Sequence, residues 1–121
     1  MRILVVGDGK VGHTLAEHLA REEHDVVIVD RSDEVLQRSE DTLDVLCVRG
    51  NGANAATLVD AGADKADIII AATASDETNM LCCLVAKKLG VHHTIARIRN
   101  PEYEKQLRFM RSELGLSMAI N

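Results

Sequence analysis

Aromatic residues are almost missing from this chain of 121 residues, which has no tryptophan, one tyrosine and one phenylalanine. Hydrophobic residues nevertheless make up 46% of the sequence, so the core has to be built from aliphatic side chains. Aliphatic strands that are buried on both faces are typical of parallel sheets covered by helices. The length is enough for one domain with a real core and too short for two.

Basic charge, long apolar runs and cysteine ligand patterns are also scarce. The net charge of -5 disfavours nucleic acid and anionic membranes as partners. No apolar run is long enough to span a bilayer, and the N-terminus lacks the pattern of a signal peptide, so we expect a cytoplasmic domain without direct membrane insertion. Cys47, Cys82 and Cys83 show no metal-ligand spacing, and we interpret them as small buried hydrophobes.

The most informative segment is a glycine-rich run at residues 3–12, which reads ILVVGDGKVG. An apolar strand leads into the pattern G-x-G-x-x-G, and a helical pattern follows. Gly7 permits the tight turn, Gly9 lets a pyrophosphate approach bare backbone, and Gly12 lets helix and strand pack closely. The acid that accompanies such a loop is Asp30, at the end of a second apolar strand. The run therefore predicts a dinucleotide-binding loop.

Asp30 also indicates which dinucleotide to expect. At the carboxyl end of its strand, its carboxylate can accept hydrogen bonds from both hydroxyls of the adenosine ribose, and it repels a 2′-phosphate. This favours NAD or NADH over NADP, although the neighbouring Arg31 can soften the preference. The alternative is that the glycines only make a turn and that Asp30 is a solvated acid. The combination of strand, loop, helix and acid favours binding.

Strands and helices alternate along the whole chain. We expect strands at 2–6, 26–30, 45–48, 68–72, 94–98 and 117–120, with helices after the glycine loop, at 33–39, from Asn51 or Asn54 to Gly62, from Ser75 to Gly90, and from Pro101 to Gly115. Because such alternation requires right-handed crossovers, we expect an α/β fold of the Rossmann type. Its parallel sheet should be doubly wound, with strand order 3-2-1-4-5-6. We also expect Leu58, Val59 and Leu81 to face the core.

Two loops after later strands hold candidate ligand contacts. Asn51 and Gly52 follow the third strand, where glycine lets the backbone approach an adenine, and Asn51 either bonds a base edge or caps a helix. Thr73 and Ala74 follow the fourth strand, across the switch point, where the second half of a dinucleotide would lie. Their small size would let the ligand pass.

Charged residues surround the same region. Arg97 and Arg99 lie two residues apart at the end of the fifth strand, so their side chains should lie on the same face of it. They can pair either with phosphate or with Asp76 and Glu77. The simpler role of the two acids is to complement the helix dipole. His13 stands one turn into the first helix, and we interpret it as an exposed helix residue.

The whole chain resembles the N-terminal nucleotide-binding domain of TrkA-type potassium-uptake regulators, the KTN or RCK family. The matching stretches are residues 6–12, 29–30, 50–52, 61–62, 66–67, 72–73, 76–80 and 96–103. The resemblance implies a peripheral cytoplasmic subunit that binds NAD(H), or ATP or ADP as in related members, and gates a membrane-embedded potassium transporter. The ligand positions that it implies are Gly7, Asp8, Gly9, Lys10, Val11, Asp30, Asn51, Gly52, Thr73, Ala74 and Arg97, to which our prediction adds Gly12 and Arg31.

The chain departs from the family pattern in two places. Family members usually continue into a crossover helix and a small C-terminal ligand domain, whereas this sequence ends at Asn121. We therefore expect residues 1–121 to be one excised N-terminal domain or a short form. Lys10 replaces the arginine of ATP-binding members, which favours the dinucleotide.

The resemblance also implies paired domains, so we expect a homodimer or a larger homo-oligomer. The helices predicted at 76–89 and 101–114 are candidate interfaces, because Met80, Tyr103 and Met110 offer adaptable apolar contact. The alternative is that these three side chains face the sheet of their own domain.

A small NAD-dependent oxidoreductase is the other function class. It would need a substrate pocket and an acid or base at the nicotinamide. Apart from His13, no ionisable residue is well placed for that chemistry, and every strand and helix is committed to the nucleotide fold. We therefore expect a regulator and not an enzyme.

Overall fold

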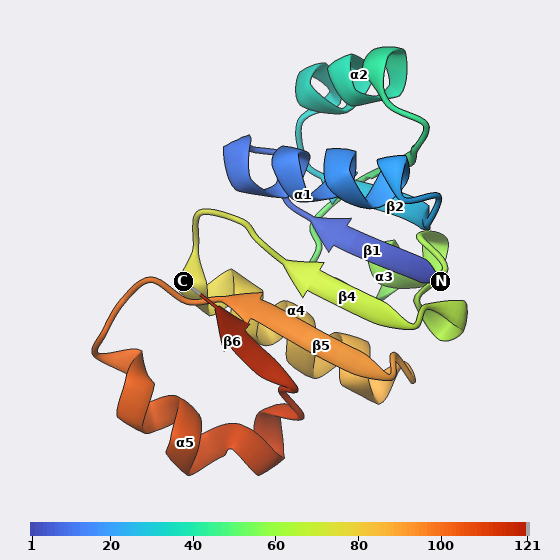
Figure 1. The fold of residues 1–121 in the computed structure, drawn as a ribbon. Helices are drawn as coiled ribbons and strands as arrows, with labels where there is room; N and C mark the ends of the chain where they lie inside the picture. Colours follow the sequence, from blue (N-terminus) through green and yellow to red (C-terminus); the bar gives the residue numbers. More distant parts are fainter. Residues whose placement is uncertain (121) are drawn as a thin grey trace.

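The structure is a computed structural model that describes residues 1–120, and it consists of a parallel six-stranded sheet with helices on both faces (Figure 1). The elements are β1 (Arg2–Val6), α1 (Lys10–Arg21), β2 (Asp25–Asp30), α2 (Asp33–Thr42), β3 (Leu46–Arg49), α3 (Ala55–Asp60), the 3-10 helix η1 (Ala63–Lys65), β4 (Ile68–Ala71), α4 (Asp76–Lys88), β5 (His93–Arg97), α5 (Tyr103–Leu114) and β6 (Met118–Ile120). The strand order β3-β2-β1-β4-β5-β6 confirms the predicted doubly wound order. Among residues 1–120, no helix is long and apolar enough to cross a membrane.

The register of the central strands places their loops at one edge of the sheet. Val6, the last residue of β1, pairs with Val29 of β2 and with Ala71 of β4. The chain reverses its direction of winding between β1 and β4, which makes their shared edge the switch point. The loops after β1, β2 and β4 therefore leave the sheet side by side, where a ligand can contact all three.

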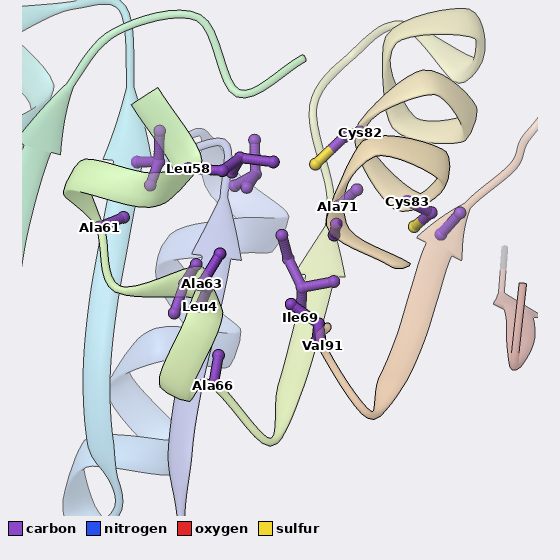
Figure 2. Packing of buried hydrophobic residues seen from close by; sticks show 14 of the residues in the cluster. Leu4, Leu58, Ala61, Ala63, Ala66, Ile69, Ala71, Cys82, Cys83 and Val91 are labelled. Atoms are coloured by element: carbon purple, nitrogen blue, oxygen red, sulfur yellow. The ribbon is translucent and has the colours of Figure 1, made fainter. Parts of the chain in front are cut away.

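Two aliphatic cores cover the two faces of the sheet. Helices α1 and α2 bury Ala16 and Leu36 on one face, while α3, α4 and α5 pack on the other. Figure 2 shows part of this second core, where Leu58 and Cys82 lie near the sheet. Cys82 and Cys83 are fully buried, as predicted, whereas Cys47 on β3 is only partly buried. Burial raises the pKa of the Cys82 thiol to about 12. Both fully buried thiols therefore act as neutral packing groups.

Two apolar side chains were wrongly expected in the core. Leu58 is fully buried, but Val59 beside it is 50% exposed, because the six-residue helix α3 turns only one such position toward the sheet. Leu81 on α4 is 48% exposed and lies instead over the carboxyl edge of the sheet.

Helix α5 begins at Tyr103, two residues later than predicted. Asn100 does not cap the helix; its side-chain oxygen accepts a hydrogen bond from Glu102 N (3.0 Å). The Tyr103 amide closes a turn by donating to the carbonyl oxygen of Asn100 (3.1 Å). Pro101 therefore belongs to a turn that precedes the helix.

Candidate functional site

A cleft of about 750 Å³ opens at the carboxyl edge of the sheet. It is formed by the loops after β1, β2, β3 and β4 together with the end of β5. Its lining consists of Val6, Gly7, Gly9, Lys10, Val11, Val29, Asp30, Arg31, Gly50, Asn51, Gly52, Ala53, Ala72, Thr73, Ala74, Ser75, Thr78, Leu81 and Arg97. Every predicted site residue is among them except Asp8 and Gly12. The structure thus gathers residues that are up to 91 positions apart in the sequence, Val6 and Arg97, around one cleft.

The three glycines of the loop have three different surroundings. Gly7 has a φ of +100°, and a Cβ atom there would lie 2.9 Å from Thr73 N, so this position needs both the unusual backbone and the close approach. A Cβ atom on Gly12 would lie 1.7 Å from the Gly7 carbonyl oxygen, which confirms its packing role and explains why it does not line the cleft. A Cβ atom on Gly9 would meet no atom within 4 Å. The backbone of Gly9 is therefore open to a ligand in the cleft.

Asp30 is held in place by backbone amides on both of its carboxylate oxygens. Oδ2 accepts a hydrogen bond from Asp8 N (2.7 Å), and Oδ1 accepts one from Ser32 N (2.8 Å). Each carboxylate oxygen has a second lone pair, so the fixed group can still accept from a hydroxyl. The carboxylate thus links β2 to the glycine loop and presents a preorganised acceptor to the cleft.

The side chain of Asp8 points away from the cleft, contrary to a role as a direct ligand contact. This side chain is 1% exposed and accepts a hydrogen bond of 2.5 Å from the hydroxyl of Ser39, which is fully buried on α2. His13 Nδ1 lies 3.2 Å from Asp8 Oδ1 and 3.0 Å from Ser39 Oγ. Only the backbone of Asp8 remains near the cleft, where its amide orients Asp30.

His13 is therefore not the freely exposed residue that the sequence suggested. Its side chain is 37% exposed and completes a polar cluster with Asp8 and Ser39 that joins the glycine loop to α2. Sequence reasoning missed Ser39. The spacing from Leu36 places it on the inner face of α2, and a serine at such a position needs a buried partner.

The loop after β3 excludes one of the two roles considered for Asn51, that of the helix cap, while its contact with a base edge stays a prediction. Asn54 caps α3, because its side-chain oxygen accepts from Ala56 N (2.8 Å). Asn51 accepts from Ala53 N (3.0 Å) and so shapes the turn beside the cleft. A Cβ atom on Gly52 would lie 2.2 Å from Val6 Cγ1, which shows that this turn packs directly over the end of β1.

The acids at the start of α4 bind backbone and tyrosine rather than arginine side chains. The carboxylate of Asp76 accepts from Arg99 N (3.0 Å) and Asn100 N (2.8 Å), and it is 8% exposed. Glu77 accepts from the hydroxyl of Tyr103, and this hydrogen bond lowers the pKa of Glu77 and raises that of Tyr103. Within residues 1–120, no ion pair joins these acids to Arg97 or Arg99.

The charge of the cleft is opposite to that of the chain. Its ionisable lining residues are three cations, Lys10, Arg31 and Arg97, and one carboxylate, that of Asp30. The chain as a whole carries a net charge of -5. A local excess of two positive charges around a cleft that includes the N-terminus of α1 suits an anionic ligand, and the fixed carboxylate of Asp30 suits hydroxyl groups.

Known proteins similar to this chain include one archaeal and one bacterial potassium uptake protein. The Trk system potassium uptake protein TrkA homolog of Archaeoglobus fulgidus is 41% identical over 120 residues, covering 99% of this chain and 27% of that protein. The Trk system potassium uptake protein TrkA of Vibrio alginolyticus is 43% identical over 112 residues, covering 90% of this chain and 24% of that protein. The chain thus spans about a quarter of the length of these relatives.

Solved structures of the GsuK channel contain a domain of the same fold. The structure of this channel bound to NAD matches 98% of this chain and 21% of its own, with a TM-score of 0.82 and 25% identity. The structure bound to ADP matches 98% of this chain and 30% of its own, with a TM-score of 0.80 and the same identity. The family model of the TrkA-N domain matches residues 3–121. The chain therefore belongs to the TrkA-N domain family.

Proposed function

We propose that this chain is the nucleotide-binding regulatory domain of a Trk- or Ktr-type potassium uptake system, and that it binds NAD(H) in the cleft. The observation that carries the proposal is the open space over Gly9, next to the fixed carboxylate of Asp30 and among the three cations of the cleft. This combination provides bare backbone for a diphosphate and an acceptor for a ribose. Binding of NAD by the GsuK channel, which contains a domain of the same fold, supports the proposal.

A dinucleotide fits the extent of the cleft better than a mononucleotide does. Its adenine would lie at the turn Gly50–Ala53, its first ribose on Asp30, and its diphosphate at Gly9. The second riboside would extend across the switch point toward Thr73 and Arg97. A mononucleotide would leave that far half empty. The GsuK channel is also described bound to ADP, so an adenine-nucleotide sensor is the second candidate.

The regulatory role follows from the relatives and from what the cleft contains. The relatives are named as potassium uptake proteins, and we infer a membrane-embedded potassium transporter subunit as the partner, with this domain on the inner face of the cell membrane. An oxidoreductase is not favoured. In the described part of the chain, Arg97 is the single ionisable residue lining the far half of the cleft, and His13 is engaged with Asp8 and Ser39.

NADH should raise the melting temperature of the protein more than NADPH does at equal concentration. A ligand that binds only the folded state stabilises it by about 2.7 kcal/mol at a hundred times its Kd. The Asp30 carboxylate should weaken the binding of NADPH because it repels the 2′-phosphate. Thermal denaturation with each nucleotide and with ATP tests this order. Equal shifts for NADH and NADPH would show that Arg31 cancels the selectivity, and a larger shift with ATP would favour the adenine-nucleotide sensor.

We also propose that the chain assembles at least into dimers through the outer faces of α4 and α5. Met80, Tyr103 and Met110 are half-buried against the core of their own domain, so they offer less free surface than the sequence suggested. Phe109 on α5, which is 83% exposed, is a better apolar contact.

Light scattering should therefore show a dimer that is lost when the charges of Lys87 and Arg108 are reversed. Both side chains are exposed, on α4 and α5 respectively, so the two reversals should disturb an interface without disturbing the core. Arg21→Glu on the exposed end of α1 is the matched control, and it should leave the dimer intact. A monomer in the wild-type protein at high concentration with NADH would contradict the proposal.

A further inference from the structure

Asn79 on α4 is a fully buried polar side chain that the proposed function does not use. Its oxygen Oδ1 accepts hydrogen bonds from Thr73 N (2.9 Å) and Thr73 Oγ1 (2.6 Å). Its nitrogen Nδ2 donates to the carbonyl oxygens of Thr73 (3.1 Å) and Arg97 (2.8 Å). The amide thus uses two acceptor and two donor positions, which is its full capacity.

These four bonds continue the link between β4 and β5 beyond the point where the strands pair. The last paired residues of the two strands are Ala71 and Ala96, so the backbones of Thr73 and Arg97 lie past the end of the ladder. The side chain of Asn79 spans the gap between them. It replaces ladder hydrogen bonds with a bridge that depends on one residue.

Both bridged residues line the far half of the cleft, on the opposite side of the switch point from Asp30. The Arg97 carbonyl is held by Asn79, while its side chain lines the cleft. The amide and the hydroxyl of Thr73 are also committed to Asn79, so Thr73 contributes a fixed surface rather than free donors. A loss of the bridge would let the two loops separate and would move this wall of the cleft.

We propose that Asn79 is a positioning residue for the second half of the bound dinucleotide. It fixes the spacing between the Thr73 loop and Arg97, and so the shape of the site that the second riboside occupies. This inference rests on the proposed binding of NAD(H), and it assigns to Asn79 no contact with the ligand itself. The adenosine half, at Asp30 and Gly50–Ala53, is bounded by other loops and does not depend on the bridge.

Thr94 provides a matched control for a purely structural role. It is also fully buried, and its hydroxyl donates to the carbonyl oxygen of Gly115 (2.8 Å) and accepts from Ser117 N (3.2 Å). It lies near the opposite, amino end of β5, away from the cleft. Thr94→Ala should therefore destabilise the fold without changing nucleotide affinity.

Calorimetric titration of Asn79→Ala with NADH and with AMP tests the inference, because AMP covers only the adenosine half. We expect the Kd for NADH to rise about tenfold, as for the loss of one or two net hydrogen bonds, and the Kd for AMP to change less than about twofold. Thr94→Ala should change neither. Equal losses for AMP and NADH, or unchanged NADH affinity in the folded variant, would overturn the positioning role.

Two further measurements apply if Asn79→Ala does not fold. Asn79→Asp keeps the side-chain volume and the acceptor toward Thr73 but removes the donors to both carbonyls, and it should show the same selective loss for NADH. In wild-type protein, NADH should shift the NMR signals of the Asn79 side-chain amide while AMP leaves them in place. Identical shifts with both nucleotides would overturn the inference. Wild-type protein that binds neither nucleotide would instead refute the proposed function.

Discussion

Asp30→Ala should weaken NADH binding by about 2 to 4 kcal/mol, which is roughly a 30- to 700-fold rise in Kd. The carboxylate lies in the cleft with both oxygens oriented by backbone amides, so it needs no rearrangement to accept from the two ribose hydroxyls. Hydrogen bonds to a charged acceptor are among the strong ones. Calorimetric titration of the folded variant measures the effect.

The same substitution should also lower the free energy of unfolding, because it removes the acceptors of Asp8 N and Ser32 N. We expect a cost of about 1 to 2 kcal/mol, so titrations have to be made well below the melting temperature. Glu34→Ala is the control, since it removes an exposed acid from the next turn of the chain without touching the cleft. Unchanged NADH affinity in folded Asp30→Ala would remove Asp30 from the site.

Gly12→Ala should be the most damaging single substitution for stability, with a cost of about 4 kcal/mol or more. The added Cβ atom would lie 1.7 Å from the carbonyl oxygen of Gly7 and 2.8 Å from its carbonyl carbon. Both neighbours are backbone atoms, so α1 would have to move away from β1 to relieve the clash. Denaturant unfolding followed by circular dichroism measures the loss.

Gly9→Ala is the matched comparison, three residues away in the same loop. Its Cβ atom would meet no protein atom within 4 Å, and the φ of Gly9 is an ordinary -78°, so the free energy of unfolding should change by less than about 0.5 kcal/mol. The methyl group would stand where we place the diphosphate, and NADH affinity should fall about tenfold. Equal stability losses at Gly9 and Gly12 would contradict the distinction between packing and binding glycines.

The parts of the fold that depend on local pattern could be predicted from the sequence. The glycine loop, the aliphatic strands and the start of a helix at Ser75 are local signals, and the structure has each of them. The strand order followed from alternation and crossover handedness. These features need no knowledge of what a distant segment contributes.

The errors concern residues whose surroundings are set by distant segments. His13 was expected to be exposed because its partner Ser39 lies 26 positions away on another helix. The helix predicted to start at Pro101 begins later, and Asp76, far back in the chain, holds the preceding loop.

Asn79 was missed for the same reason, since an asparagine within a helix shows its function only when its partners at Thr73 and Arg97 are known. The predicted site residues other than Asp8 and Gly12 line the cleft, and their contact with a nucleotide stays a prediction. The preference for one nucleotide over another is a difference between two binding free energies, and the sequence pattern of the loops does not determine it.

A crystal structure of the protein grown with equal concentrations of NADH and ATP would show whether the cleft binds NAD(H) along its whole length. We expect one NAD(H) molecule across the whole cleft, with its adenosine ribose on Asp30, its diphosphate over Gly9 and its second riboside between Thr73 and Arg97. ATP bound in the adenosine half with the Thr73 and Arg97 side empty, or no nucleotide in the cleft, would contradict this expectation.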